Sequence, residues 1–203
     1  MNMPDTPRRS DATRAQILHA ARARFAAGGY QKATIRAIAA DAGIDPSMVM
    51  RYYGNKAKLF AAAVDLDLHL PDLTAVPRRR LGQTLVAHFL RRWEGDPTDD
   101  GLLLLLRSAA TDELAAGRMR AIFRDQLVPT LLTVVGDPAE AAQRAGLIST
   151  QMLGLALCRN ILRLPPVAGL TPQTVVARIG PTIQRYLTGP LHPPETARRP
   201  PTR

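Results

Sequence analysis

The chain is poor in cysteine, in aromatic residues and in long apolar runs. Among its 203 residues is one cysteine, Cys158, so neither an internal disulfide nor a cysteine-based metal cluster can form. The longest leucine run, residues 102–106, is far shorter than the roughly 20 apolar residues that cross a bilayer. The first ten residues, MNMPDTPRRS, lack the apolar core of a signal peptide. We therefore expect a cytoplasmic protein with a reduced thiol.

What the chain does have is positive charge. It carries 27 basic and 17 acidic residues, which gives a formal net charge of +10. A protein this basic favours a polyanionic partner, either nucleic acid or an anionic membrane surface. All but three of the basic residues are arginine, and alanine is abundant, which indicates a GC-rich coding preference. Composition alone therefore does not choose the partner.

Both ends have the composition of unstructured segments. Residues 1–10 are polar and basic, and residues 189–203, GPLHPPETARRPPTR, are proline-rich with too little apolar content to pack. The residues between them show helical periodicity and no strand-like alternation. We expect an all-α protein of about nine helices. They are placed at residues 11–27, from 34, from 45, 55–70, 78–93, 99–110, 112–135, 138–164 and 171–188.

Glycine and proline mark where these helices should begin, bend and end. The pair Gly28-Gly29 should stop the first helix, and Pro165-Pro166 should end the one that begins near residue 138. Pro129 and Pro181 fall inside expected helices, where proline kinks the helix or marks a break.

The segment from Thr34 to Phe60, TIRAIAADAGIDPSMVMRYYGNKAKLF, has the spacing of a helix-turn-helix. Ala39 is small enough for a second helix to pack against it, and Gly43 tolerates the backbone angles of a tight turn. Val49 lies six residues later on the expected buried face. An ordinary helical hairpin would share this spacing, so the exposed residues have to support the functional reading.

The helix that begins at Asp45-Pro46 should expose a face suited to DNA. Ser47 can bond to base edges, methionine packs against thymine methyls, and Arg51 can reach a guanine or a phosphate. Thr34 caps a helix N-terminus suited to a phosphate. The expected DNA-contacting residues are Thr34, Arg36, Pro46, Ser47, Met48, Met50, Arg51, Tyr52, Asn55 and Lys56. A basic N-terminal arm with Arg8, Arg9 and Arg14 either enters the minor groove or is a loosely attracted tail.

The run from Thr13 to Phe60 resembles the N-terminal domain of the TetR family of regulators. The matching positions are Ala21, Phe25, Gly28, Tyr30, Thr34, Ile38, Ala39, Gly43, Tyr53, Lys56 and Leu59. The resemblance covers about a quarter of the chain and implies an all-helical homodimeric repressor that leaves a palindromic DNA operator when a small molecule binds. Met50 stands where the family often has tyrosine, so operator preference cannot be transferred.

This reading divides the chain into a basic tail (1–10), a three-helix helix-turn-helix domain (11–57), a helical effector-binding and dimerisation domain (58–188) and a Pro/Arg-rich tail (189–203). By resemblance, the last two long helices pair with their symmetry mates, unless they are simply protomer core. Small residues should allow close approach and apolar ones should make contact: Gly146, Gly154 and Ala156, with Ile148, Met152 and Leu155.

An effector pocket would lie in the larger domain. Its candidate lining is His88, Trp93, Met119, Phe123, Met152 and Cys158, although a packed core uses the same residue types. Cys158 beside Arg159 could be a redox thiol or a structural cysteine. The histidines make no metal pattern, and no catalytic motif is present. We expect no metal, no cofactor and no enzyme activity.

The leading hypothesis is thus a ligand-controlled transcriptional repressor whose partners are double-stranded DNA, a small-molecule effector and a second copy of the chain. One alternative is a constitutive, nucleoid-like DNA binder with sequence-independent affinity. The other is a helical enzyme that uses the larger domain.

Overall fold

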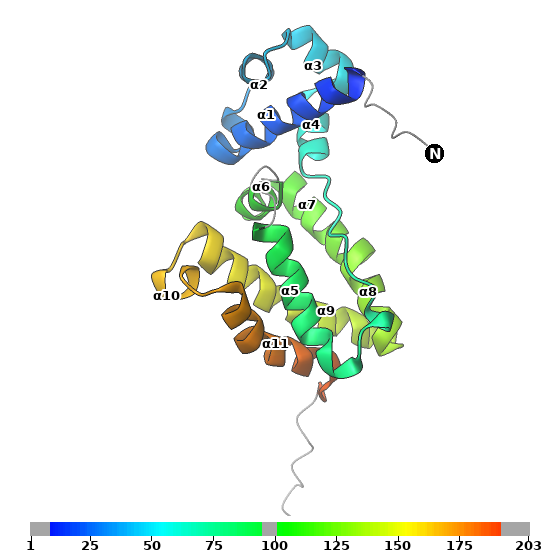
Figure 1. The fold of residues 1–203 in the computed structure, drawn as a ribbon. Coiled ribbons are helices and arrows are strands. Elements are labelled where there is room, and N and C mark those ends of the chain that lie inside the picture. The colour runs from blue at the N-terminus through cyan, green and yellow to red at the C-terminus, as the bar shows by residue number, and fades with distance from the viewer. Residues whose placement is uncertain (1–8, 95–100, 192–203) are drawn as a thin grey trace, which may run out of the picture. The chain divides into compact units, whose positions relative to one another are not determined.

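The computed structural model describes residues 9–94 and 101–191, and every regular element in those ranges is helical (Figure 1). The all-α expectation is therefore confirmed. The chain forms two units: Met1–Asp67 with Asp96–Ile122, and Leu68–Gly95 with Phe123–Arg203. Most of the two expected tails, including Arg8, lies outside the described residues.

The first unit has six helices in its described part. They are α1 (Arg9–Lys32), α2 (Ile35–Asp41), α3 (Pro46–Tyr53), α4 (Lys56–Ala63), α6 (Gly101–Ser108) and α7 (Glu113–Ile122). Three aromatic rings hold α1 against α4. Phe60 meets Phe25 and Tyr30 edge-on, with ring centroids 5.0 and 5.1 Å away. Such edge-to-face pairs add to the apolar burial that stabilises this core.

Gly28-Gly29 interrupts the first helix, as expected from the sequence. Gly29 has a non-helical φ of 72° and ψ of 168°, and a second, short helical segment follows it up to Lys32. Such a left-handed φ is open to glycine, which has no Cβ. The expected stop at this pair is therefore confirmed, and the short helical turn after Gly29 carries Tyr30, whose ring contacts Phe60.

The expected helix over residues 55–70 is wrong in its second half, because α4 ends at Ala63. Two arginines from other helices satisfy the carbonyl groups at this end. Arg22 donates from Nε to Ala63 O at 2.9 Å, and Arg118 donates to Val64 O at 3.3 Å and to the Asp65 carboxylate. Both arginines are distant in sequence, so periodicity could not reveal where the helix stops.

The second unit contains the longest helices after α1. Its elements are η1 (Leu73–Ala75), η2 (Arg78–Arg80), α5 (Leu81–Glu94), η3 (Phe123–Leu127), α8 (Val128–Val135), α9 (Pro138–Ala156), η4 (Leu157–Ile161), α10 (Pro165–Ala168) and α11 (Pro172–Thr188). Its core contains Leu85, Leu131, Ile148 and Ile183. No helix in the described ranges is long and apolar enough to span a membrane.

α5 and α11 cross at two glycines. A Cβ on Gly82 would lie 2.4 Å from both Gln184 N and Gly180 O, closer than carbon can approach backbone. Gln184 secures the crossing, accepting from Gly82 N at 2.9 Å through Oε1 and donating to Arg78 O at 2.9 Å through Nε2. Only glycine fits this approach.

Two π-helical segments interrupt helices that were expected to be continuous. η3 ends at Leu127, two residues before Pro129, which lacks the N–H that an α-helical hydrogen bond would use. The chain stays helical through Pro129, and the irregularity that accompanies this proline is the π-helical segment before it. Pro165 does not end a helix as expected; it begins α10, because proline also suits a first helical position. Pro181 lies inside α11, which continues to Thr188.

α9 buries one face in its own protomer. Ile148, Met152, Leu155 and Ala156 are at most 8% exposed within this core. The expectation that they contact a second copy is therefore wrong. Helical spacing identified the apolar stripe that forms the core, while the outward face includes the exposed Leu147 of α9 and Leu157 at the start of η4, which are 36% and 40% exposed.

Arg144 is the buried charged residue of α9, with 5% of its surface exposed. Its guanidinium pairs with Glu140 at 2.8 Å and donates to the carbonyl oxygens of Tyr186 and of Gly189, the latter at 2.8 Å. A cation at a helix C-terminus satisfies the free carbonyl groups and the negative end of the helix dipole. Arg144 thereby fixes the end of α11 on α9.

Candidate nucleic-acid interface

The turn between α2 and α3 is built by local hydrogen bonds. Thr34 begins α2 as its N-cap, accepting from Ala37 N through Oγ1 at 3.1 Å. Gly43 takes a φ of +65°, and the next residue, Ile44, donates its N–H to Ala39 O at 3.0 Å. The left-handed glycine lets the chain reverse within three residues. The Ala39 and Gly43 roles inferred from spacing match this geometry.

The start of α3 is fixed by Asp45. Its carboxylate accepts from Ser47 N at 2.8 Å, and Pro46 occupies the first helical position. The hydroxyl and the backbone N–H of Ser47 stabilise the charged carboxylate and hold the pKa of Asp45 below its usual value. Ser47 is therefore positioned by the cap as well as exposed on the helix.

Val49 determines which face of α3 points outward. Its side chain and those of Ile38 and Ala39 are completely buried. On the opposite side Ser47, Met50 and Arg51 are exposed, Met50 at 45%. Pro46, Met48 and Tyr52 are partly buried, while Thr34, Arg36 and Asn55 are exposed. The residues expected from the sequence to be available to DNA are thus solvent-accessible to differing degrees.

The end of α3 is tied to α1 through Arg14. The Tyr53 hydroxyl donates to Arg14 O at 3.3 Å, and the Arg14 guanidinium lies 5.5 Å from the ring centroid of Tyr52. Burial raises the pKa of Tyr53. Both tyrosines are therefore held against α1, and Arg14 adds a positive charge next to Tyr52.

Asn55 and Lys56 start α4. The Asn55 side chain caps the helix, accepting from Lys58 N through Oδ1 at 2.8 Å. Lys56 donates from Nζ to Gln31 O at 3.2 Å, and the same nitrogen lies 4.5 Å from the ring centroid of Tyr30. An ammonium has three N–H donors, so these contacts orient Lys56 and still leave donors for a phosphate.

An ion pair missed by the sequence reading fixes α2 on α1. Arg24 donates to both oxygens of the Asp41 carboxylate, from Nε to Oδ2 and from Nη2 to Oδ1, the latter at 2.7 Å. This hydrogen bonding lowers the pKa of Asp41 and raises that of Arg24. The two residues lie 17 apart, and no local motif marks such a pairing.

The six expected effector-contacting residues are spread over both units. Met119 belongs to the first unit and the other five to the second. His88 is half-buried with Nε2 2.8 Å from Leu68 O, and Trp93 stacks at 5.6 Å on Phe89. Met152 is buried in the core, Phe123 packs against that core, and Cys158 is a partly exposed free thiol.

Two family models match the chain. Residues 17–63 match the model described as bacterial regulatory proteins, tetR family. This range includes α2, α3 and the turn between them. Residues 80–187, more than half of the chain, match the tetracyclin repressor-like C-terminal domain.

Three individual proteins are similar to the chain in sequence or in fold. A TetR-family regulator from Streptomyces coelicolor A3 is 30% identical, with a TM-score of 0.62 over 91% of this chain and 99% of its own. NalD, the secondary repressor of the MexAB-OprM multidrug efflux pump in Pseudomonas aeruginosa, is 21% identical with a TM-score of 0.67 over 87% of this chain and 97% of its own, which shows a shared fold. The HTH-type transcriptional repressor SCO4008 of Streptomyces coelicolor is 44% identical over 55 residues, 27% of this chain and only 29% of that relative. The chain belongs to the TetR family of DNA-binding transcriptional regulators.

Proposed function

We propose that this regulator is a repressor that binds a palindromic operator as a homodimer and leaves it when a small molecule binds the second unit. Each protomer would place α3 in the major groove, with two recognition helices about 34 Å apart, one turn of duplex.

The observation that carries this proposal is the outward face of α3. Because Val49 is buried and Asp45 caps the helix, Ser47, Met50 and Arg51 project together into solvent. Arginine bonds to guanine O6 and N7, serine to base edges, and methionine packs on thymine methyls. These three side chains are our choice for base contacts.

Phosphate contacts would flank that face. Thr34 and Arg36 lie at the start of α2, and Asn55 and Lys56 at the start of α4. The free N–H groups of helix N-termini favour anions, and basic side chains release counterions from DNA. Such contacts set the register of α3 and carry no sequence information.

Dimerisation is assigned to α9 with α11. The outward stripe that runs along α9 into the first residue of η4 is Gln143, Leu147, Thr150, Gly154 and Leu157, spaced alternately by four and three residues as in a coiled-coil seam. A Cβ on Gly154 would meet nothing within 4 Å, so a second helix can approach its backbone. Leu147 and Leu157 supply the exposed apolar contact.

Control by a ligand would act as a population shift. A molecule that binds better to a dimer whose recognition helices do not match the operator spacing removes the protein from DNA. A differential affinity of about 1–3 kcal/mol between the two states is enough for a clear response.

Selection of bound duplexes from a random DNA pool, at near-physiological salt and with excess competitor, tests the proposal. We expect enrichment of a palindrome with half-sites one turn apart. Well-folded protein that enriches no sequence would instead support the constitutive, sequence-independent binder.

A further inference from the structure

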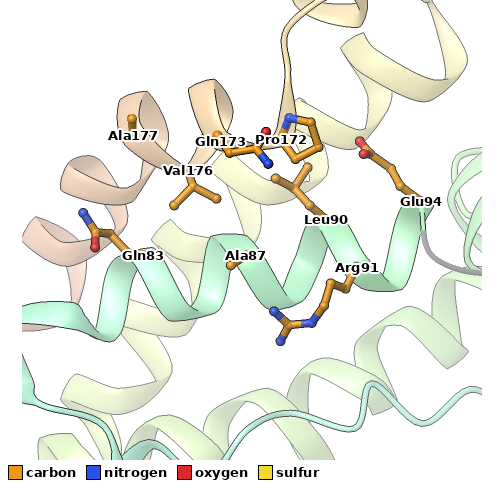
Figure 2. A pocket seen from close by; sticks show the side chains of 9 residues that line it. All are labelled: Gln83, Ala87, Leu90, Arg91, Glu94, Pro172, Gln173, Val176 and Ala177. Carbon is orange, nitrogen blue, oxygen red and sulfur yellow. The ribbon is translucent and has the colours of Figure 1, made fainter.

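A groove of about 570 Å³ lies in the second unit between α5 and α11 (Figure 2). The helices are antiparallel: Gln83, near the start of α5, and Glu94, at its end, both border the groove, as does Pro172 at the start of α11. From Gln83 to Glu94, 11 steps along the helix, α5 rises about 16 Å, so the groove is elongated.

The close crossing of the two helices creates the groove. At Gly82 and Gly180 the backbones touch, and the helices separate toward the end of α5. There the facing side chains include Ala87 and Ala177, which are too small to fill the gap. Leu90 and Val176 form an apolar wall, and Figure 2 shows Val176 directed toward α5.

Hydrogen bonds and an ion pair fix the protein at both ends of the groove. Gln184 bonds to Gly82 N and Arg78 O at the crossing. At the other end the guanidinium of Arg159, whose side chain is 10% exposed, pairs with Glu94 at 2.6 Å and donates to Val167 O at 2.8 Å. The separation of the helices is therefore set by the protein itself, so the groove exists before any ligand arrives.

The polar groups of the groove have little net charge. Gln83 and Gln173 contribute neutral carboxamides that both donate and accept hydrogen bonds. The Glu94 carboxylate is already balanced by Arg159, and Figure 2 shows the Arg91 side chain directed away from α11. An uncharged molecule can use these groups without leaving a charge desolvated.

We propose that this groove binds one uncharged, elongated organic molecule, with an apolar body along Ala87, Leu90 and Val176 and hydrogen-bonding groups at its ends. The volume falls in the range of about 300–1,000 Å³ that suits small-molecule sites. None of the six effector-contacting residues expected from the sequence borders it. The inference gives the effector of the proposed function a site and a chemistry, and it rests on that function only for the consequence at DNA.

Binding is measured with N-phenyl-1-naphthylamine, an uncharged amine that joins a naphthyl and a phenyl group and whose fluorescence rises in apolar surroundings. Ala87→Phe and Ala177→Phe fill the groove from its two walls, and Ala177 is exposed, so its replacement does not overpack the core. The matched control is Ala139→Phe, at an exposed position of α9. We expect saturable binding to the wild type and control, and affinity lower by about tenfold or more in both groove variants.

Three results would overturn the proposal. They are no saturable binding to wild type up to the solubility limit of the probe, unchanged affinity in both groove variants, or a change of oligomeric state in the groove variants by sedimentation. The last would make the groove an interface between copies. Because no DNA is present, failure here leaves operator binding untouched, and failure of operator binding leaves this result standing.

Discussion

The ammonium nitrogen of Lys56 lies 4.5 Å from the ring centroid of Tyr30, so the first residue of α4 is held against the last turn of α1. Its second contact, to Gln31 O, comes from the same turn. Lys56 is thus oriented by α1 at the edge of the proposed DNA-binding face.

Lys56→Ala should weaken binding to all DNA sequences alike. Loss of one phosphate contact should reduce the slope of log affinity against log salt by about one, measured by fluorescence anisotropy. Arg124→Ala, which removes an exposed arginine of the second unit paired with Asp125, is the control for charge alone. If the Lys56 variant keeps the wild-type slope, Lys56 serves only to hold α4 on α1.

Gly82→Ala should destabilise the second unit. Its new methyl group would overlap Gln184 N and Gly180 O, so the two helices must separate, at a cost of about 1–3 kcal/mol or more. Chemical denaturation measures the loss. Gly117→Ala is the matched control, since a Cβ there meets only Arg120 Nη2 at 3.8 Å, and alanine in an open helix should stabilise by about 0.5–1 kcal/mol. Equal effects of the two changes would show that the crossing is not tight.

Arg144→Ala should lower the free energy of unfolding by about 2–4 kcal/mol, because it leaves the Tyr186 and Gly189 carbonyl groups without their donor and Glu140 without its partner. Arg144→Lys keeps the charge but loses the forked geometry, and we expect it to recover only part of the loss. Urea denaturation of the wild type, Arg144→Ala and Arg144→Lys measures the three free energies of unfolding. Full recovery by lysine would mean that charge alone matters.

His88 should make stability depend on pH. Burial, together with the positive charges of Arg91 and Arg92 and with His69, lowers its pKa below the ordinary 6.5, against the effect of its hydrogen bond to Leu68 O. The unfolded chain then binds a proton at His88 more readily than the folded chain does. The contribution of neutral His88 to the free energy of unfolding is therefore fully present above pH 6.5 and is lost as pH falls below that value. Thermal melts should show a smaller acid-induced drop in His88→Gln than in wild type. An identical drop in both would place the pH dependence elsewhere.

The sequence predicted local caps and turns better than features that depend on distant residues, for a physical reason. Helix caps and tight turns depend on residues within four positions, so Thr34, Gly43 and Asp45 could be read directly. The end of α4 depends on Arg22 and Arg118, which lie 41 and 54 residues from the carbonyl groups they bind. No local pattern contains that information.

The same limit applies to the candidate sites. Helical spacing separates the inward from the outward face of α3, because one residue, Val49, marks the buried side. On α9 the spacing identifies an apolar stripe but not its partner, and the packing of Ile148 and Met152 shows that this stripe is core of the same protomer. The α5–α11 groove joins residues about 90 positions apart, with Gly82 and Gly180 at its origin, and only the folded chain brings them together.

The central claim is that the outward face of α3 reads DNA sequence. The most direct test repeats the selection from random duplexes with a variant in which Ser47, Met50 and Arg51 are all alanine; these positions are exposed, so the fold should be kept. We predict that the wild type enriches one palindrome, while the folded variant binds DNA weakly and enriches none. Enrichment of the same palindrome by the variant would contradict the account, because sequence would then be read by another part of the protein.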